Sequence, residues 1–212
     1  MRNPTLNALA LAVAIALPVA ATAMETPEER LSYTIDLLVE ALRAAYAGEE
    51  TRLTQEEALA ERDAFMQRRQ QEMEQQRGVE AERNLEEGQA FLAQNRDNPD
   101  VQETASGLQY RVVQEGTGAS PEATDQVTVH YVGTLINGVE FDSSRARGEP
   151  ATFALNQVIP GWTEGVQLMS EGAIYEFFIP ADLAYGEQGR PGPIGPNSTL
   201  IFEVELLEVQ SD

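Results

Sequence analysis

The feature that most constrains this chain is a change of composition near Asn98. Residues 24–98 are rich in Glu, Gln, Arg, Ala and Leu, with three glycines and one proline. The chain from Pro99 onward holds 13 of the 16 glycines and 8 of the 11 prolines. Because helix formers dominate the first segment and turn formers punctuate the second, the sequence predicts a helical part followed by a β-rich domain.

Charge and missing residue types exclude several functions. The chain carries 35 acidic and 14 basic residues, every basic one an arginine, for a net charge of −21. This acidity repels phosphate backbones, so nucleic acid is not an expected partner. With no cysteine, the 212-residue chain can form no disulfide, thiol nucleophile or thiolate metal centre. One histidine and no calcium-loop spacing of carboxylates lead us to expect no metal and no cofactor.

Residues 1–23 have the layout of a secretory signal peptide. Arg2 precedes a short apolar core over residues 9–19, and Ala21-Thr22-Ala23 follows it. A charged start, a short apolar core and an A-x-A end are typical of cleavable signals. The core is shorter than a bilayer span, so we expect no membrane span in the mature chain. The expected location is the periplasm, with outer-membrane association left open; the alternative for this segment is a buried apolar helix.

Residues 24–98 are predicted to form a helical dimerisation domain that ends in a stalk. A capping box at Thr26 and Glu29 opens the first helix, whose apolar stripe is Leu31, Ile35, Leu38 and Leu42. A second capping box starts at Thr54 and opens a helix with a thinner stripe: Ala58, Leu59, Phe65, Met66 and Met73. Such one-sided stripes need a partner surface, which favours a homodimer; a monomeric helical hairpin is the alternative.

The helical part loses its apolar face toward its end. Beyond Arg77, only Leu85, Phe91 and Leu92 are apolar candidates for packing. A helix that is polar almost all round is not buried in a core, so this segment is predicted to be a stalk that crosses solvent. Helix breakers then follow in residues 99–106, which are predicted to be a linker to the domain over residues 107–212.

The second part alternates like an antiparallel sheet. Residues 127–131 place two valines and Tyr131 on one face, and residues 200–206 repeat the alternation. Asn137-Gly138 is typical of a hairpin turn. Residues 163–169 are predicted to form a short helix and residues 184–196, rich in glycine and proline, a long structured loop. The fold class is therefore α+β, with an antiparallel sheet wrapped on one short helix.

Aromatic residues form the most unusual concentration in this part. Six of them lie near turns or at strand positions that could converge: Tyr131, Phe141, Phe153, Trp162, Tyr185 and Phe202. Taken singly, each is most simply part of a core. Two details favour a site, because Asp142 directly follows Phe141 and the sole tryptophan, Trp162, follows a turn with backbone donors. His130 lies on the strand face opposite Tyr131 and is expected to be a solvated or edge histidine rather than a catalytic one.

Five motifs of this second part resemble FKBP-type peptidyl-prolyl cis-trans isomerases. They are VHYVGTL from Val129, GVEFDSS from Gly138, VIPGWTEG from Val158, LAYG from Leu183 and TLIFEVEL from Thr199. They follow the family's order and spacing over residues 107–209. The ASGLQY segment from Ala105, the GPIGP loop from Gly192 and the helical first part further resemble the secreted Mip- and FkpA-like branch.

This resemblance implies a half-barrel of five or six antiparallel strands around a short helix, with a proline pocket between them. The implied catalytic residues are Tyr131, Phe141, Asp142, Trp162, Tyr185 and Phe202, and the implied substrate-binding residues are Phe153, Val158, Ile159 and Ile194. Trp162 would form the floor, and the Ile159 N–H would hold a substrate carbonyl. Departures from the family pattern at Ala151, Arg190 and Pro193 bear on substrate preference and inhibitor affinity.

The implied function is isomerisation of X–Pro bonds during folding of secreted proteins, with chaperone activity. Expected partners are unfolded or proline-containing polypeptides, the macrolides tacrolimus and rapamycin, and a second copy of the chain. The alternative is a non-enzymatic holdase chaperone or surface interaction protein with a vestigial pocket. Retention of nearly all the pocket residues favours the enzyme.

Overall fold

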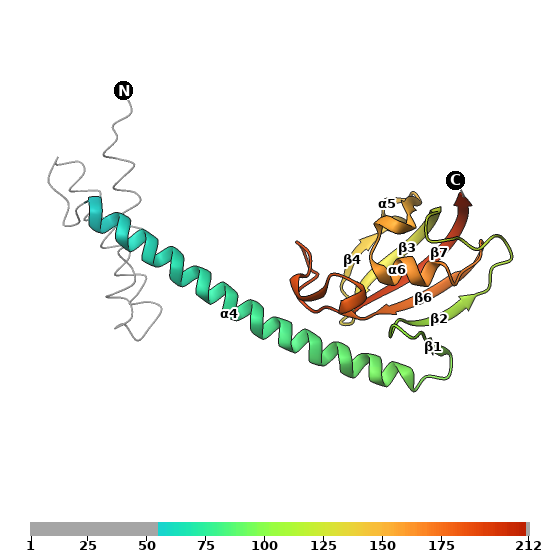
Figure 1. The fold of residues 1–212 in the computed structure, drawn as a ribbon, viewed down its shortest axis with the longest axis horizontal. Helices are drawn as coiled ribbons and strands as arrows, with labels where there is room; N and C mark the ends of the chain where they lie inside the picture. Colours follow the sequence, from blue (N-terminus) through green and yellow to red (C-terminus); the bar gives the residue numbers. More distant parts are fainter. Residues whose placement is uncertain (1–54, 211–212) are drawn as a thin grey trace, which may run out of the picture. The chain divides into compact units, whose positions relative to one another are not determined.

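A computed structural model describes residues 55–210 of the chain, which divides into two compact units between Gln75 and Gln76 (Figure 1). The predicted signal peptide and the first predicted amphipathic helix lie outside the described residues. The described part of the first unit is the start of helix α4 (Gln55–Arg96), which continues into the second unit. Phe65, Met66 and Met73 on this helix are 37%, 61% and 51% exposed in the single chain.

The second unit is built on one antiparallel sheet (Figure 1). Its strands are β1 (Val101–Glu103), β2 (Gln109–Gln114), β3 (Gln126–Leu135), β4 (Glu140–Ser143), β5 (Ala151–Ala154), β6 (Ile174–Ile179) and β7 (Leu200–Gln210). The strand order is β1-β2-β6-β7-β3-β4, and β5 pairs with β3 beyond the end of β4. The α+β class is thus confirmed: a long helix is followed by an antiparallel sheet.

The sheet has seven strands, more than the five or six that the resemblance implies. Part of the difference lies in residues 99–106, which were expected to be a linker. Val101 pairs with Arg111, and Glu103 with Gln109, so this stretch contributes the edge strand β1. Three residues are too few for a period-two pattern, which explains why the sequence alone did not reveal this strand.

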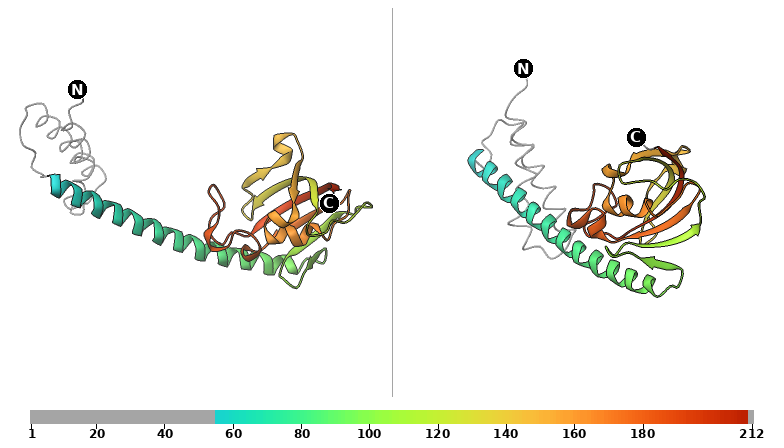
Figure 2. Two further views of the ribbon diagram at one scale, coloured as in Figure 1. Left: turned by 45° about the horizontal axis from the view of Figure 1, so that its top comes forward. Right: turned by 45° about the vertical axis from the view of Figure 1, so that its right-hand side comes forward.

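Short helices complete the domain (Figure 2). They are α5 (Ser144–Arg147), α6 (Pro160–Val166) and the 3₁₀ turns η1 (Leu155–Gln157), η2 (Ala181–Leu183) and η3 (Gly186–Gln188). Helix α6 begins three residues earlier than the predicted helix over residues 163–169, because Pro160 takes the first helical position, where its missing N–H costs nothing. A Cβ at Gly165 would lie 2.7 Å from the Phe177 ring, so this glycine allows α6 to pack closely on β6.

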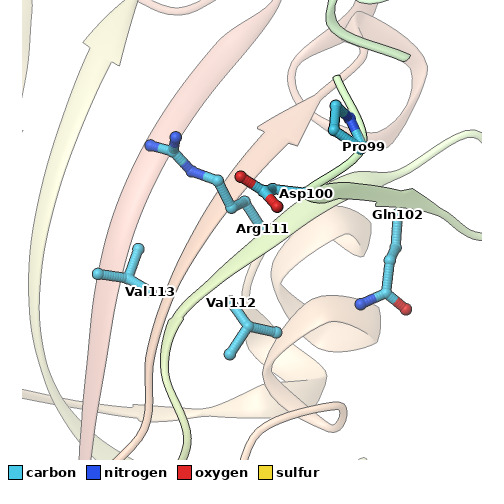
Figure 3. Close-up of a pocket in the computed structure, with 6 residues that line it drawn as sticks. All are labelled: Pro99, Asp100, Gln102, Arg111, Val112 and Val113. Carbon is cyan, nitrogen blue, oxygen red and sulfur yellow. The ribbon is translucent and has the colours of Figure 1, made fainter. Parts of the chain in front are cut away.

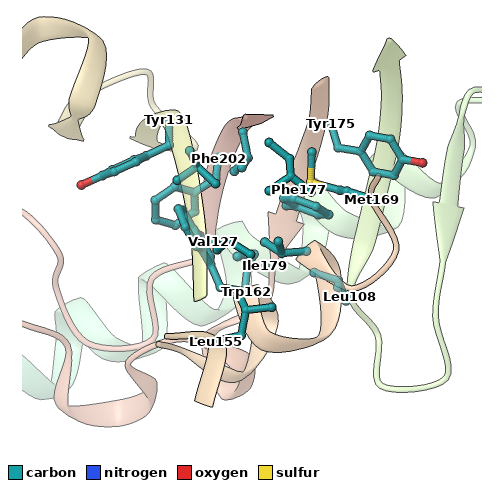
Figure 4. Close-up of a cluster of buried hydrophobic side chains, with 14 of the residues drawn as sticks. Leu108, Val127, Tyr131, Leu155, Trp162, Met169, Tyr175, Phe177, Ile179 and Phe202 are labelled. Atoms are coloured by element: carbon teal, nitrogen blue, oxygen red, sulfur yellow. The ribbon is translucent and has the colours of Figure 1, made fainter. Parts of the chain in front are cut away.

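The predicted alternation of the long strands is confirmed. Val127, Val129 and Tyr131 of β3 are buried, whereas Thr128 and His130 between them are only partly so. The buried side of β7 is Leu200, Phe202, Val204 and Leu206. These side chains meet those of β6 and α6 in one continuous core (Figure 4). The predicted hairpin turn is also present, since Gly138 has a φ of +83° and donates to the Leu135 carbonyl at 2.8 Å.

The second half of α4 differs from the predicted stalk. Its last turns pack on the sheet domain within the second unit: the Phe91 and Phe178 rings lie 5.9 Å apart, and Gln109 donates to the Leu92 carbonyl at 3.0 Å. The residues that face the domain are Ala81, Asn84, Gly88, Phe91, Leu92 and Asn95. Their spacing is helical, but four of the six are polar or lack a large side chain, so hydrophobic periodicity does not reveal the face.

Candidate active site

Three aromatic rings converge on Trp162, and a fourth, that of Phe141, packs on Phe202. We call Tyr131, Phe141, Phe153, Trp162 and Phe202 the aromatic cluster. The Trp162 ring lies edge-on to those of Phe202, Tyr131 and Phe153, with centroid distances of 5.2, 5.3 and 5.5 Å. Edge-to-face contacts at these distances are favourable because the positive edge of one ring meets the negative face of another. Five of the six aromatic residues that the sequence singled out therefore lie together, and Figure 4 shows three of them, Tyr131, Trp162 and Phe202.

The start of α6 places Trp162 under the sheet. The Ile159 carbonyl accepts the backbone N–H groups of Trp162 and Thr163 at 2.9 and 3.1 Å, which fixes the first turn. The Thr163 hydroxyl donates to the Leu155 carbonyl at 2.6 Å and ties the turn to η1. A Cβ at Gly161 would lie 2.5 Å from the Ile179 side chain, so only glycine permits this approach to β6. The indole Nε1 is buried and donates to no group in the described residues.

A glycine on β3 makes room for two rings of the cluster. A Cβ at Gly133 would lie 2.6 Å from the Phe141 ring and 2.7 Å from the Phe202 ring. These two rings meet edge-on with centroids 5.4 Å apart. Phe202 is 5% exposed, whereas Phe141 is partly exposed at the rim.

Tyr131, Asp142 and Arg147 form a closed set of hydrogen bonds beside the aromatic cluster. The Tyr131 hydroxyl donates to Asp142 Oδ2 at 2.7 Å and accepts from Arg147 Nη2 at 2.8 Å. Arg147 Nη1 donates to the other oxygen of Asp142. The guanidinium also lies 5.5 Å from the centre of the Tyr131 ring, a distance at which a cation attracts an aromatic face.

These contacts keep Asp142 ionised. Burial by itself would raise the pKa of the Asp142 carboxyl, but hydrogen bonds from Tyr131 and Arg147 outweigh it and hold that pKa below its ordinary value. Burial raises the pKa of the Tyr131 hydroxyl, and its bond to Asp142 raises it further. At neutral pH the pair is therefore a carboxylate and a neutral phenol, suited to orienting groups rather than to exchanging protons.

The sequence prediction missed Arg147 and the role of Ser144. Helix α5 carries both, and it follows the strand that bears Asp142. Ser144 Oγ accepts the Tyr131 backbone N–H at 2.8 Å and lies 3.1 Å from His130 Nδ1. The signal available in the sequence was the pair of arginines, Arg145 and Arg147, directly after the GVEFDSS motif. His130 is half-buried, and its Nδ1 forms a hydrogen bond with Ser144 Oγ.

The other sequence-predicted residues belong to the hydrophobic core that contains Trp162 or pack against it. Phe153, Val158, Ile159 and Tyr185 are partly buried and pack against the core, and Ile194 is buried in it at 5% exposure. The Tyr185 hydroxyl accepts from Arg190 Nη1 at 3.2 Å, and the Arg190 guanidinium lies 5.6 Å from the Tyr185 ring centre. Arg190, one of the departures from the family pattern, thus restrains a predicted site residue.

An open depression lies elsewhere, over β1 and β2 (Figure 3). It measures about 670 Å³ and is lined by Pro99, Asp100, Gln102, Arg111, Val112 and Val113. None of these residues belongs to the aromatic cluster. The depression is polar and wide open, whereas small-molecule and peptide sites are lined mainly by apolar and aromatic groups, so we place the candidate site at the cluster.

An antiparallel sheet wrapped on a short helix, with an edge-on aromatic cluster between them, defines the class of FKBP-like peptidyl-prolyl isomerases. Residues 118–207 match the family model described as FKBP-type peptidyl-prolyl cis-trans isomerase. Residues 10–112 match the model for the domain amino-terminal to such isomerases. The chain belongs to the FKBP-type peptidyl-prolyl cis-trans isomerase family.

Its relatives lie in the branch that the sequence motifs indicated. The outer membrane protein MIP of Legionella longbeachae is 39% identical over 99% of this chain and 98% of its own length. A probable FKBP-type isomerase FkpA from Neisseria meningitidis serogroup B is 46% identical over 86% of this chain and 67% of its own length. The crystal structure of FkpA from Escherichia coli superimposes with a TM-score of 0.74, at 33% identity over 99% of this chain and 98% of that one.

None of the helices in residues 55–210 is both long and apolar enough to cross a membrane. In the same residues, no three acidic or histidine side chains gather in a way that would hold a metal ion.

Proposed function

We propose that the aromatic cluster is where this isomerase binds the proline of its substrate and accelerates rotation about the preceding peptide bond. The observation that carries the proposal is the edge-on packing of Trp162 with three other rings, directly beside the ionised Asp142. A proline ring is apolar and compact, and aromatic surfaces of this kind suit it.

The reaction needs rotation and no bond exchange. Resonance gives the C–N bond partial double-bond character and a barrier of about 18–20 kcal/mol, so uncatalysed X–Pro exchange takes about tens to hundreds of seconds. The planar amide is more polar than the twisted one, because twisting interrupts the resonance. A water-poor aromatic environment therefore disfavours the planar ground state relative to the twisted state. Each tenfold gain in rate requires about 1.4 kcal/mol of this difference.

Roles for individual residues follow from their positions. Trp162 and Phe202 would hold the proline ring, with Phe141 and Phe153 at the sides. Ile159 is the residue just before α6, so no carbonyl of the helix accepts its backbone N–H. This N–H would donate a hydrogen bond to a substrate carbonyl. Asp142 would orient Tyr131 toward the substrate. Val158, Tyr185 and Ile194 would contact the flanking residues.

We also propose that the protein works outside the cytoplasm as a homodimer with chaperone activity. The predicted signal peptide supports export, and the name of the Legionella relative refers to an outer membrane. The exposed Phe65, Met66 and Met73 support a second copy as the partner surface, because a monomer seldom leaves a helical apolar stripe uncovered. Two linked sites could engage one long client twice and raise its effective concentration.

The competing proposal is a holdase that binds unfolded chains without isomerising them. The exposed Phe65, Met66 and Met73 would then bind the unfolded chains. It is less favoured because a vestigial site has no need of the hydrogen bonds among Tyr131, Asp142 and Arg147.

An exchange assay on short X–Pro peptides tests the proposal with the full mature chain. We expect NMR exchange or protease-coupled rates well above the uncatalysed rate, and loss of that acceleration with saturating rapamycin or tacrolimus. Refolding of a proline-limited protein and sedimentation then test the chaperone and dimer proposals. A folded chain that prevents aggregation but accelerates no peptide would support the holdase instead.

A further inference from the structure

The loop between η2 and β7 lies beside the second half of α4 (Figure 2). Two asparagines join loop and helix by hydrogen bonds in opposite directions. From the helix, Asn84 Nδ2 donates to the Pro196 carbonyl at 2.8 Å. From the loop, Asn197 Nδ2 donates to the Ala81 carbonyl at 3.3 Å. We call these two bonds the amide clasp. Both lie within the compact unit that begins at Gln76.

Two glycines allow helix and loop to approach this closely. A Cβ on Gly195 of the loop would lie 2.6 Å from Glu80 Oε1 and 3.0 Å from Asn84 Nδ2. A Cβ on Gly88 of the helix would lie 2.3 Å from Thr199 Oγ1. The atoms that Gly195 would meet are the ends of the Glu80 and Asn84 side chains, which can shift, whereas a Cβ on Gly88 would also lie 3.3 Å from Thr199 Cβ, so the contact at Gly88 is the more restrictive. The contact between helix and loop is thus made by polar and small residues rather than by an apolar patch.

The clasp holds a segment that regular structure restrains little. The residues between η3 and β7 include three prolines and belong to no strand. Asn197 has a φ of +54°, the only such value among the described non-glycine residues, and its N–H donates to the Gly186 carbonyl at 2.9 Å. A free loop of this length would lose conformational entropy each time it was ordered around a substrate. The clasp keeps it ordered beforehand.

The same loop carries residues of the candidate site. Tyr185 precedes η3, and Ile194 is buried in the core next to the clasped Gly195 and Pro196. Arg190 bonds to Tyr185 through its side chain, and its N–H donates to the Ile194 carbonyl at 2.9 Å. A short path of hydrogen bonds and peptide bonds thus connects the clasp to both site residues.

We propose that Asn84 and Asn197 are positioning residues of the isomerase: through the amide clasp, helix α4 holds the loop that presents Tyr185 and Ile194 to the substrate. The proposal rests on the proposed function of the aromatic cluster. The clasp touches none of its five rings, so it acts on how well substrate is held and not on the barrier to rotation of bound substrate.

Variants of the full mature chain test this proposal. Asn84→Ala removes the helix donor and raises helix propensity, so any loss does not come from a weaker helix. Asn197→Gly removes the loop donor and keeps the positive φ. Gln89→Ala, an exposed amide on the same helix, is the matched control. KM and kcat are measured from the NMR rate of cis–trans exchange in an X–Pro peptide. Amide hydrogen exchange measures how well residues 186–198 of the protein are ordered.

We expect each clasp variant to raise KM about three- to tenfold and leave kcat within about twofold, with faster exchange in the loop and unchanged exchange in β3 and β7. The double variant should be little worse than either single one, because either loss opens the same clasp. Gln89→Ala should resemble the wild type. Unchanged KM and unchanged loop exchange in the double variant would overturn the proposal, as would equal loosening of the whole sheet.

Failure of the proposed function would look different. In that case the wild-type chain itself would isomerise no peptide. Amide hydrogen exchange of residues 186–198 in the variants would still show whether the clasp orders the loop. If that exchange were unchanged, the clasp proposal would be overturned even without an activity measurement.

Discussion

The hydroxyl of Tyr131 donates to Asp142 Oδ2 at 2.7 Å across the β3–β4 hairpin. The same hydroxyl accepts from Arg147, and Arg147 also donates to Asp142. Each of the three side chains therefore forms hydrogen bonds with the other two. The ring of Tyr131 meanwhile packs against Trp162 and Phe202, so one side chain joins the polar set to the aromatic cluster.

Removing that hydroxyl tests the connection. We expect Tyr131→Phe to lower kcat/KM for a short X–Pro peptide about three- to tenfold and the free energy of unfolding by about 0.5–1.5 kcal/mol, because one hydrogen-bond donor is lost while the ring remains. Peptide exchange rates and urea unfolding measure the two effects. Tyr110→Phe is the control: its hydroxyl bonds to Gln102 on the edge strand, away from the cluster. Equal kcat/KM losses in both variants would contradict a local role.

The lowered pKa of Asp142 predicts a loss of stability in acid. A carboxyl whose pKa is lower in the folded state stabilises the fold above its unfolded pKa, about 3.9, and this stabilisation is lost as the pH falls through the folded pKa. Wild type should therefore exceed Asp142→Asn in stability at pH 7, and the difference should shrink by pH 3. Urea unfolding at both pH values checks it. A difference that grows in acid would show that the sign is wrong.

Two glycines of α4 should respond oppositely to the same change. Gly78→Ala meets nothing within 4 Å and should stabilise the protein by up to about 1 kcal/mol, because alanine is the better helix former. Gly88→Ala gains the same propensity but places a Cβ against Thr199, so it should destabilise. Thermal unfolding of both full-length variants measures the pair. Stabilisation by both would show that α4 does not pack closely against Thr199.

Trp162 is the sole tryptophan and should report ligand binding directly. We expect its emission to change as rapamycin or a proline-containing peptide saturates the aromatic cluster, because a ligand displaces water near the indole. Fluorescence titration gives the affinity, and Phe202→Leu should weaken it. A competitive inhibitor that abolishes activity without altering the emission would place the site elsewhere.

Two truncations test where the catalytic domain begins. The predicted domain over residues 107–212 omits β1 and the turns of α4 that cover Phe178, whereas a fragment from Gln76 keeps both. We expect the longer fragment to unfold at a higher urea concentration, since the shorter one exposes apolar surface and a new sheet edge. Urea midpoints of the two fragments decide the point. Equal urea midpoints would show that the catalytic domain begins at residue 107, as the sequence predicts.

The aromatic cluster and the long strands could be predicted from local sequence. Period-two alternation places the valines around Tyr131 and the residues around Phe202 on one face, and Asn137-Gly138 specifies a hairpin because its turn needs a positive φ. Sequence motifs then supplied the family and the candidate residues. Such signals are readable because each depends on residues a few positions apart.

Tertiary structure decided the features that join distant residues. Arg147 reaches Tyr131 only because the hairpin and α5 bring them together, and nothing in its neighbourhood encodes that bond. The docking face of α4 is built from Asn84, Gly88 and similar residues that act through hydrogen bonds and close approach. Hydrophobic periodicity does not record such contacts, because their energy depends on where the partner backbone lies and not on how apolar the helix is.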